Sequence, residues 1–104
     1  MNVLTKTTFV EAARKYPNDR DALPTIYRVL SKGDFPDPLA LKAVFPTLDN
    51  FKYVDKWWGI DVGGNNLRLV ACIFFKPQMV YVKGIFSHAD YDKFTAQYRG
   101  KKKP

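Results

Sequence analysis

One stretch of the sequence is the most informative about the fold: Trp57-Trp-Gly-Ile-Asp-Val-Gly-Gly-Asn-Asn-Leu-Arg-Leu-Val-Ala-Cys-Ile-Phe-Phe-Lys76. Aromatic and β-branched residues dominate it, and the Gly-Gly-Asn-Asn segment in its middle is a strong hairpin-turn signal. The pattern predicts one strand over residues 57–62 and a second over residues 67–76. Both sides of the second strand are apolar except at Arg68, so we expect this strand at the centre of a sheet.

The residues after this hairpin predict one more strand and a closing helix. A break that contains a proline leads to a third strand over residues 79–86. A helix should start near Ser87, because Ser87 has N-cap chemistry and Asp90 follows it by three residues. Phe94 and Tyr98 are four residues apart on this helix and are expected to pack inward.

The residues before the hairpin predict helices. Residues 8–16 carry apolar side chains at helical spacing, and Thr8 and Glu11 have the spacing of a capping box. A second helix is expected over residues 19–32, and a short helical turn over residues 38–45. This order indicates an α+β fold, in which two N-terminal helices pack on a small antiparallel sheet and a short C-terminal helix follows.

Composition limits the class of protein. The chain has 104 residues, of which 46% are hydrophobic, so residues 1–104 suit a single domain with a real core. One cysteine cannot form an internal disulfide, and the sequence offers no CxxC motif or Cys/His cluster for a metal. These features favour a reducing, cytoplasmic location. The N-terminus lacks the apolar run of a signal peptide, and no 18 uncharged apolar residues run together, so we expect no membrane segment.

Positive charge is concentrated in the second half of the chain. The sequence holds 17 Lys and Arg against 10 Asp and Glu, for a net charge of +7. Residues 50–104 carry ten of the basic residues and four of the acidic ones, so this half accounts for +6. Residues 99–104 form a basic tail that we expect to be flexible. Such a field suits a polyanion such as a nucleic acid, whereas a basic domain with solvated lysines is the alternative.

Three motifs, in the same order, resemble those of one known family. They are Asp49-Asn-Phe-Lys-Tyr-Val-Asp-Lys-Trp57, Val62-Gly-Gly-Asn-Asn-Leu-Arg-Leu-Val-Ala71 and Ile85-Phe-Ser-His-Ala-Asp-Tyr-Asp-Lys93. Together they resemble the HigB toxins of the RelE-like superfamily of bacterial toxin–antitoxin systems. The resemblance implies a curved antiparallel sheet, a ribosome-dependent mRNA endonuclease that inhibits translation, and neutralisation by a HigA-like helix-turn-helix antitoxin. It also implies cleavage by attack of the 2′-OH on the adjacent phosphate, with no metal and no cofactor.

Metal-free RNA cleavage needs a cation for the phosphate, a group that exchanges protons, and surfaces that hold the RNA. Arg68 matches the Arg of the superfamily's central strand, which implies a phosphate clamp, and a guanidinium suits this contact. The alternative is a salt bridge with a nearby Asp; we favour the phosphate role because Arg68 interrupts an apolar strand. The resemblance points to His88 for proton exchange, which suits its chemistry, although it could be a polar residue in the first turn of its helix. Tyr91 lies on the same helix face and could stack on a base or orient the phosphate, and the alternative is a core tyrosine that packs with Phe94.

Lysines beside aromatic residues add a second group of candidates. Lys52 and Lys56 are four residues apart and would share one face of an extended chain beside Tyr53 and Trp57. Such a surface suits RNA binding, although exposed lysines on strands also protect sheet edges. Two further lysines complete the predicted RNA-binding set, Lys83 and Lys93.

One strand departs from the superfamily pattern. Other RelE-like nucleases tend to carry lysines in the strand before the hairpin, but here Gly59 and Asp61 occupy its polar positions. Proton transfer must therefore fall on another group. Lys56 is the preferred acid/base or phosphate contact, with His88 as the other candidate.

Two other functions stay open on the sequence. Superfamily relatives of the ParE type act on gyrase and do not cut RNA, so a non-catalytic member that binds gyrase or nucleic acid is the alternative. A basic housekeeping RNA-binding domain is a third possibility, and it would need no antitoxin.

Overall fold

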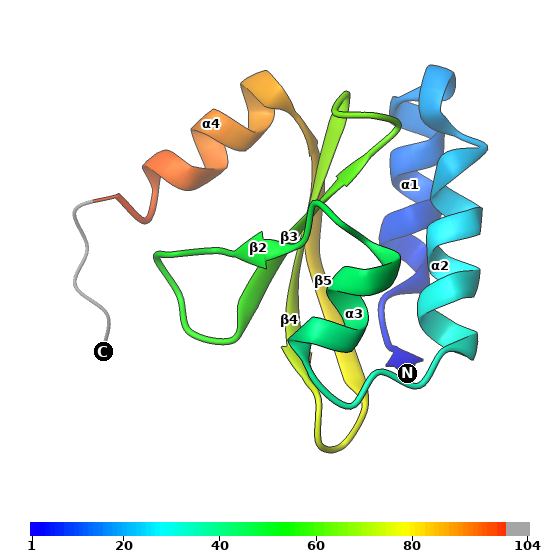
Figure 1. Cartoon of the computed structure of the whole chain (residues 1–104). Coiled ribbons are helices and arrows are strands. Elements are labelled where there is room, and N and C mark those ends of the chain that lie inside the picture. The colour runs from blue at the N-terminus through cyan, green and yellow to red at the C-terminus, as the bar shows by residue number, and fades with distance from the viewer. Residues whose placement is uncertain (100–104) are drawn as a thin grey trace.

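The computed structural model describes residues 1–99, in which helices flank one mixed sheet (Figure 1). The helices are α1 (Lys6–Lys15), the short 3-10 helix η1 (Pro17–Asp19), α2 (Ala22–Lys32), α3 (Pro38–Val44) and α4 (His88–Ala96). The strands are β1 (Asn2–Val3), β2 (Asp49–Asn50), β3 (Trp57–Val62), β4 (Leu67–Phe74) and β5 (Met79–Ser87). The predicted α+β class is confirmed.

The strands described within residues 1–99 form one sheet in the order β1-β5-β4-β3-β2. Strands β2 to β5 pair antiparallel, and β4 lies at the centre as predicted. Strand β1 instead pairs parallel to β5, with Asn2 opposite Met79, so the prediction of a purely antiparallel sheet is wrong at this edge. A two-residue strand is too short to show alternation, and for that reason the sequence pattern contains no sign of β1 or β2.

The predicted hairpin is confirmed, and β3 has the predicted bounds. Gly63 and Gly64 adopt φ values of +61° and +75°, which the tight turn between β3 and β4 requires and which glycine adopts without strain. Strand β4 ends at Phe74, two residues before the predicted end. The chain turns there because the Phe75 carbonyl accepts the Gln78 N–H at 3.1 Å.

The helix starts differ from the predictions for local reasons. Helix α1 begins at Lys6, so the expected capping box at Thr8 is wrong. Its N-cap residue, Thr5, does not cap the helix with its side chain, because the hydroxyl accepts the Val82 N–H of β5 at 2.8 Å. Helix α2 begins at Ala22 because the preceding residues form η1. Helix α4 is capped by Ser87 as predicted, since its hydroxyl accepts the Asp90 N–H at 3.3 Å.

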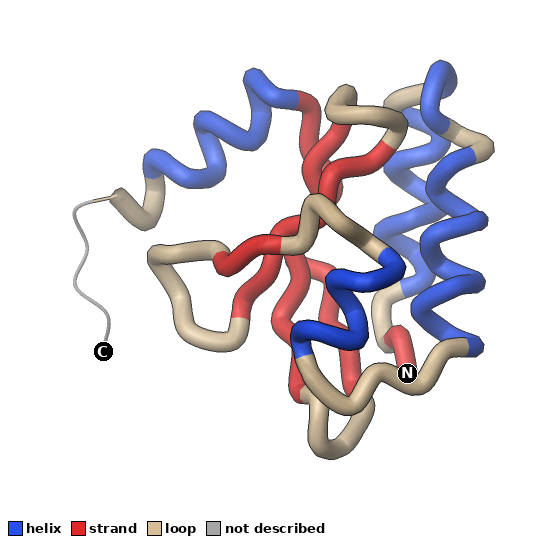
Figure 2. The backbone as a smooth tube through the Cα atoms, viewed as in Figure 1, coloured by secondary structure: helices blue, strands red, loops and turns tan. Residues whose placement is uncertain are grey.

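The two faces of the sheet are covered by different elements. Figure 2 shows the strands crossing between the α1–α2 pair and α4. The main core lies under α1 and α2, and its fully buried side chains include Leu23, Leu30, Leu41, Ile60, Leu69 and Val80. The opposite face carries a smaller aromatic cluster, in which α4 packs on the sheet and on the loop after β2: Phe51, Trp57, Phe86, Phe94 and Tyr98. Phe94 and Tyr98 therefore pack inward as predicted.

No helix within residues 1–99 is both long enough and apolar enough to cross a lipid bilayer. The predicted basic tail lies outside the described residues, apart from Arg99.

Candidate active site

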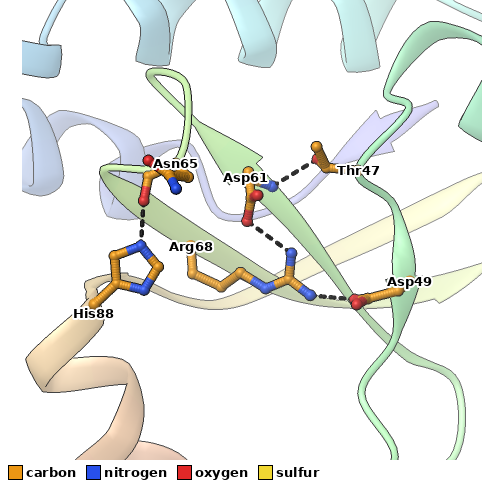
Figure 3. A network of polar contacts seen from close by, with 6 residues as sticks. All are labelled: Thr47, Asp49, Asp61, Asn65, Arg68 and His88. Carbon is orange, nitrogen blue, oxygen red and sulfur yellow. Dashed lines mark hydrogen bonds and ion pairs between the residues drawn. The ribbon is translucent and has the colours of Figure 1, made fainter.

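Arg68 lies on β4 directly opposite Asp61 of β3 and reaches across the sheet toward its edge. Its guanidinium donates to Asp61 Oδ1 at 2.8 Å and also to Asp49 Oδ1 on β2 (Figure 3). The Arg68 side chain is only 13% exposed. The sequence left open a salt bridge between Arg68 and a nearby Asp, and the structure contains two such ion pairs.

Gly59 makes this path across β3 possible. It faces Asp49 in the ladder, and a Cβ at this position would lie 2.5 Å from Nη2 of Arg68. No side chain fits between the guanidinium and the strand at such a distance. Gly59 thus makes room for the arginine.

The surroundings keep Arg68 charged. Burial of the guanidinium acts against its charge, but Asp49, Asp61 and Tyr91 outweigh this effect and hold the pKa of Arg68 above its ordinary value. The Tyr91 ring centroid lies 5.8 Å from Arg68 Cζ, within range of a cation–π contact. The site therefore presents a permanent cation with an aromatic ring beside it.

A cleft of about 270 Å³ opens over this cation. It is bounded by the loop after β2 and by α4, and its lining combines aromatic, cationic and acidic side chains: Asp49, Asn50, Phe51, Lys52, Tyr53, Arg68, Tyr91, Asp92, Thr95 and Arg99. Four of the residues predicted for the site share this cleft, namely Arg68, Tyr91, Lys52 and Tyr53. Lys52 Nζ lies 5.2 Å from the Tyr53 ring centroid, so a second cation–aromatic pair stands at its rim.

His88 lies at the first position of α4 and is exposed. Its Nε2 contacts the backbone carbonyl of Asn65 in the β3–β4 turn, whereas the Arg68 guanidinium points away toward Asp49 (Figure 3). His88 is not among the residues that line the Arg68 cleft.

The start of α4 is held in place by α1. The Tyr16 hydroxyl donates to Asp90 Oδ2 at 3.1 Å and accepts the Ser87 N–H at 3.2 Å. Lys15 Nζ also lies 3.1 Å from Asp90 Oδ2, and these two partners lower the pKa of the Asp90 carboxyl. Because Ser87 and Asp90 both bond to the Tyr16 hydroxyl, the backbone of His88 between them is held in place.

The other predicted residues lie elsewhere on the surface. Residues 52–56 form turns, so the expectation that Lys52 and Lys56 share a face of an extended chain is wrong. Lys56 has a φ of 64°, places its Nζ 5.2 Å from the Phe74 ring centroid, and lines a separate hollow with Trp58. A different lysine, Lys83 of β5, lies 5.4 Å from the Trp57 ring centroid.

Lys93 is exposed on α4. Within residues 1–99, no group of three or more His, Cys, Asp or Glu side chains is arranged to hold a metal ion.

Comparison with known proteins assigns the family. The sequence-family model for HigB toxins, described as the RelE-like toxic component of a toxin–antitoxin system, matches residues 19–94 of this chain. The chain belongs to the HigB toxin family. It is 51% identical over 102 residues to the mRNA interferase HigB of Escherichia coli O6:H1. The matched region covers 98% of this chain and 99% of the relative. It is 46% identical over 103 residues to the mRNA interferase toxin HigB of E. coli K12 and to the mRNA interferase HigB of Shigella flexneri, with 99% of each chain covered.

The resemblance drawn from the three sequence motifs is therefore confirmed for this HigB-family chain. The prediction omitted both carboxylates on Arg68. Asp49 is the first residue of the first motif, and Asp61 is an acidic residue within an apolar strand. Neither position indicates in the sequence that these carboxylates pair with Arg68. Arg99 was counted only as part of the tail, yet it lines the Arg68 cleft.

Proposed function

We propose that this HigB-family chain is an mRNA interferase that cuts mRNA on the ribosome and so inhibits translation. One observation carries the proposal: a charged, nearly buried guanidinium forms the floor of a cleft lined by tyrosines and further cations. The relatives named mRNA interferase, which match almost the whole chain, support the same activity. In the reaction the 2′-OH loses its proton and its oxygen bonds to the adjacent phosphorus, while the bond from phosphorus to the 5′-oxygen breaks and that oxygen leaves with a proton. The products are a 2′,3′-cyclic phosphate and a 5′-OH end, and no metal is needed.

Arg68 is the group that we assign to the phosphate. A guanidinium in a partly desolvated cleft stabilises the charge that develops on the pentacoordinate phosphorus more strongly than it would in water. Tyr91 and Tyr53 provide ring faces on which RNA bases can stack, and Lys52 and Arg99 supply charge for the backbone. These residues bind and orient the RNA.

We assign proton transfer to His88. His88 lies outside the lining of the cleft, but it is three residues before Tyr91 on α4 and contacts the turn that leads into the strand of Arg68. Lys56 lines a different hollow. Lys56 and Lys83, with Trp57, then serve as contacts for RNA or the ribosome outside the cleft, and Lys93 extends this surface on α4.

The partners follow from the family. A toxin of a toxin–antitoxin system has an antitoxin partner, and we propose a HigA-like helix-turn-helix protein for this role. We propose a cytoplasmic location, because the reaction requires access to translating ribosomes.

Mapping of mRNA 5′ ends after induced expression tests the proposal. The parent chain should create new ends within reading frames, and Arg68→Ala should reduce them by about 100-fold or more, the effect of losing one preorganised charge. Arg28→Ala is the matched control, because it removes one exposed arginine from α2 on the other side of the sheet. His88→Ala should impair cleavage as well.

Two results would contradict the proposal. If the parent chain produced no new ends but arrested DNA replication, the protein would belong with the non-cutting members of the superfamily. If Arg68→Ala stayed folded by circular dichroism and cleaved as fast as Arg28→Ala, the assignment of the cleft would be wrong.

A further inference from the structure

The two carboxylates on Arg68 differ in how firmly they are held. The Asp61 side chain is 24% exposed, whereas the Asp49 side chain is 62% exposed. Asp61 lies within the six-residue strand β3, directly opposite Arg68, and its backbone N–H donates to Thr47 Oγ1 at 2.9 Å. Asp49 belongs to the two-residue strand β2 at the edge of the sheet. Asp61 is therefore the fixed partner, and Asp49 is the partner that can leave.

The two carboxylates also use different parts of the guanidinium. Asp61 accepts from Nη1 and Asp49 accepts from Nη2. Of the two, Asp49 alone lines the cleft that opens over Arg68. The Nη2 side of Arg68 is thus the side that an incoming anion reaches, and Asp49 already occupies it.

We propose that Asp49 holds the position on Arg68 that an RNA phosphate takes during the reaction, and that the phosphate must displace it, while Asp61 positions the guanidinium. The inference rests on the proposed function of the Arg68 cleft. A phosphate beside a carboxylate on the same nitrogen meets like-charge repulsion, so binding requires Asp49 to turn into solvent. Its exposure allows this movement without disturbing the core.

This arrangement selects for substrates that are held by additional contacts. Free RNA brings only its own charge to the cleft and must compete with a carboxylate already in place. An mRNA that the ribosome presents is held at the cleft by other contacts, and its phosphate has a high effective concentration there. Asp49 therefore weakens binding of free polyanions more than it weakens action on presented mRNA.

Binding of an uncleavable oligonucleotide tests the proposal separately from catalysis. The probe is a fluorescently labelled single-stranded DNA of about ten nucleotides, a length within the usual site sizes of single-strand binders; it has phosphates but no 2′-OH. Asp49→Asn should raise its affinity about tenfold. The matched control is Asp92→Asn, which removes the same charge from the same cleft at a residue of α4 that is not one of the two carboxylates on Arg68. The control should raise affinity only about two- to threefold, through the general loss of negative charge.

Two further variants define the mechanism. Asp61→Asn should not raise affinity above the control, because it frees no position in the cleft and loosens the guanidinium. In an Arg68→Gln background, Asp49→Asn should give no more than the gain seen with Asp92→Asn. Equal gains for the Asn variants at 49 and 92 in the parent chain, or a tenfold gain that persists without Arg68, would overturn the proposal.

The outcome for Asp49 is independent of the outcome for the nuclease. If the parent chain cuts mRNA but Asp49→Asn gains nothing beyond the control, the displacement proposal fails and the proposed function stands. If Asp49→Asn gains tenfold while the parent chain creates no new mRNA ends, the cleft binds phosphate and the nuclease assignment fails.

Discussion

Gly59→Ala is the substitution that tests most directly how Arg68 is placed. The added Cβ would lie 2.5 Å from Nη2, 2.7 Å from Cζ and 2.8 Å from Nε of Arg68. Because these atoms form the far end of a flexible side chain, we expect the guanidinium to swing away while the strand stays in place. Both ion pairs, with Asp61 and Asp49, would then be lost.

The magnitude follows from the burial of these ion pairs. Exposed ion pairs contribute at most about 1 kcal/mol, and breaking a fully buried pair costs about 3–5 kcal/mol. Arg68 is nearly buried but Asp49 is largely exposed, so we expect a loss of about 1–2 kcal/mol, of which replacing a strand glycine by alanine recovers about 0.5 kcal/mol. A net loss of about 1 kcal/mol lowers the Tm of a domain of this size by about 4–8 °C.

The assay is urea denaturation of Gly59→Ala in the parent chain and in an Arg68→Ala background. Without the guanidinium the new methyl group has space, so the same substitution should stabilise the protein by about 0.5 kcal/mol. The effect of Gly59→Ala should therefore change sign between the two backgrounds, with a coupling of about 1.5 kcal/mol. An equal destabilisation in both would show that position 59 needs glycine for its backbone, and the account of the site would be wrong.

Three further predictions concern the placement of α4. Tyr16→Phe removes a hydroxyl that bonds Asp90 and the Ser87 N–H. It should lower the free energy of unfolding, measured in urea titrations, by about 1–2 kcal/mol and should speed amide exchange in α4. Unchanged exchange would contradict this role. The lowered pKa of Asp90 means that its pairing with Lys15 stabilises the fold above the ordinary pKa of Asp, and that this stabilisation is lost as pH falls through the lower folded-state pKa. Asp90→Asn should accordingly be less stable than the parent chain at neutral pH, and the difference should close as pH falls through the lowered folded-state pKa of Asp90. A difference that is constant with pH would refute the pairing. Phe94→Ala removes a ring that stacks on Phe86 with the ring centroids 4.5 Å apart. It should lower the free energy of unfolding by about 2–3 kcal/mol and make α4 sensitive to limited proteolysis. A variant as resistant to the protease as the parent chain would show that other contacts hold α4.

The structure shows how one residue can satisfy both interpretations that its sequence position allowed. Arg68 interrupts an apolar strand, which suggested either an anion-binding role or a salt bridge with an Asp. In the fold it pairs with Asp61 and Asp49 and also forms the floor of a cleft. Under the proposed function, the ion pair with Asp61 positions the guanidinium, and Asp49 occupies the place that a phosphate would take.

The elements whose signals are local could be predicted from the sequence alone. Strand β3 was predicted with its observed bounds, because alternation over six residues and a Gly-Gly-Asn-Asn turn are both read within the hairpin. The start of α4 at Ser87 followed in the same way from cap chemistry within one turn. The family resemblance also needed only short motifs in order.

Contacts between residues distant in the sequence could be seen only in the folded chain. Strands β1 and β2 are two residues long and carry no periodicity, so their places beside β5 and β3 depend on the packing of the whole chain. For the same reason the sequence could not show that Asp49 reaches Arg68, or that Gly59 leaves the space between them. These contacts depend on strand register, and register is set by which face of each strand the core buries rather than by any local pattern around the residues themselves.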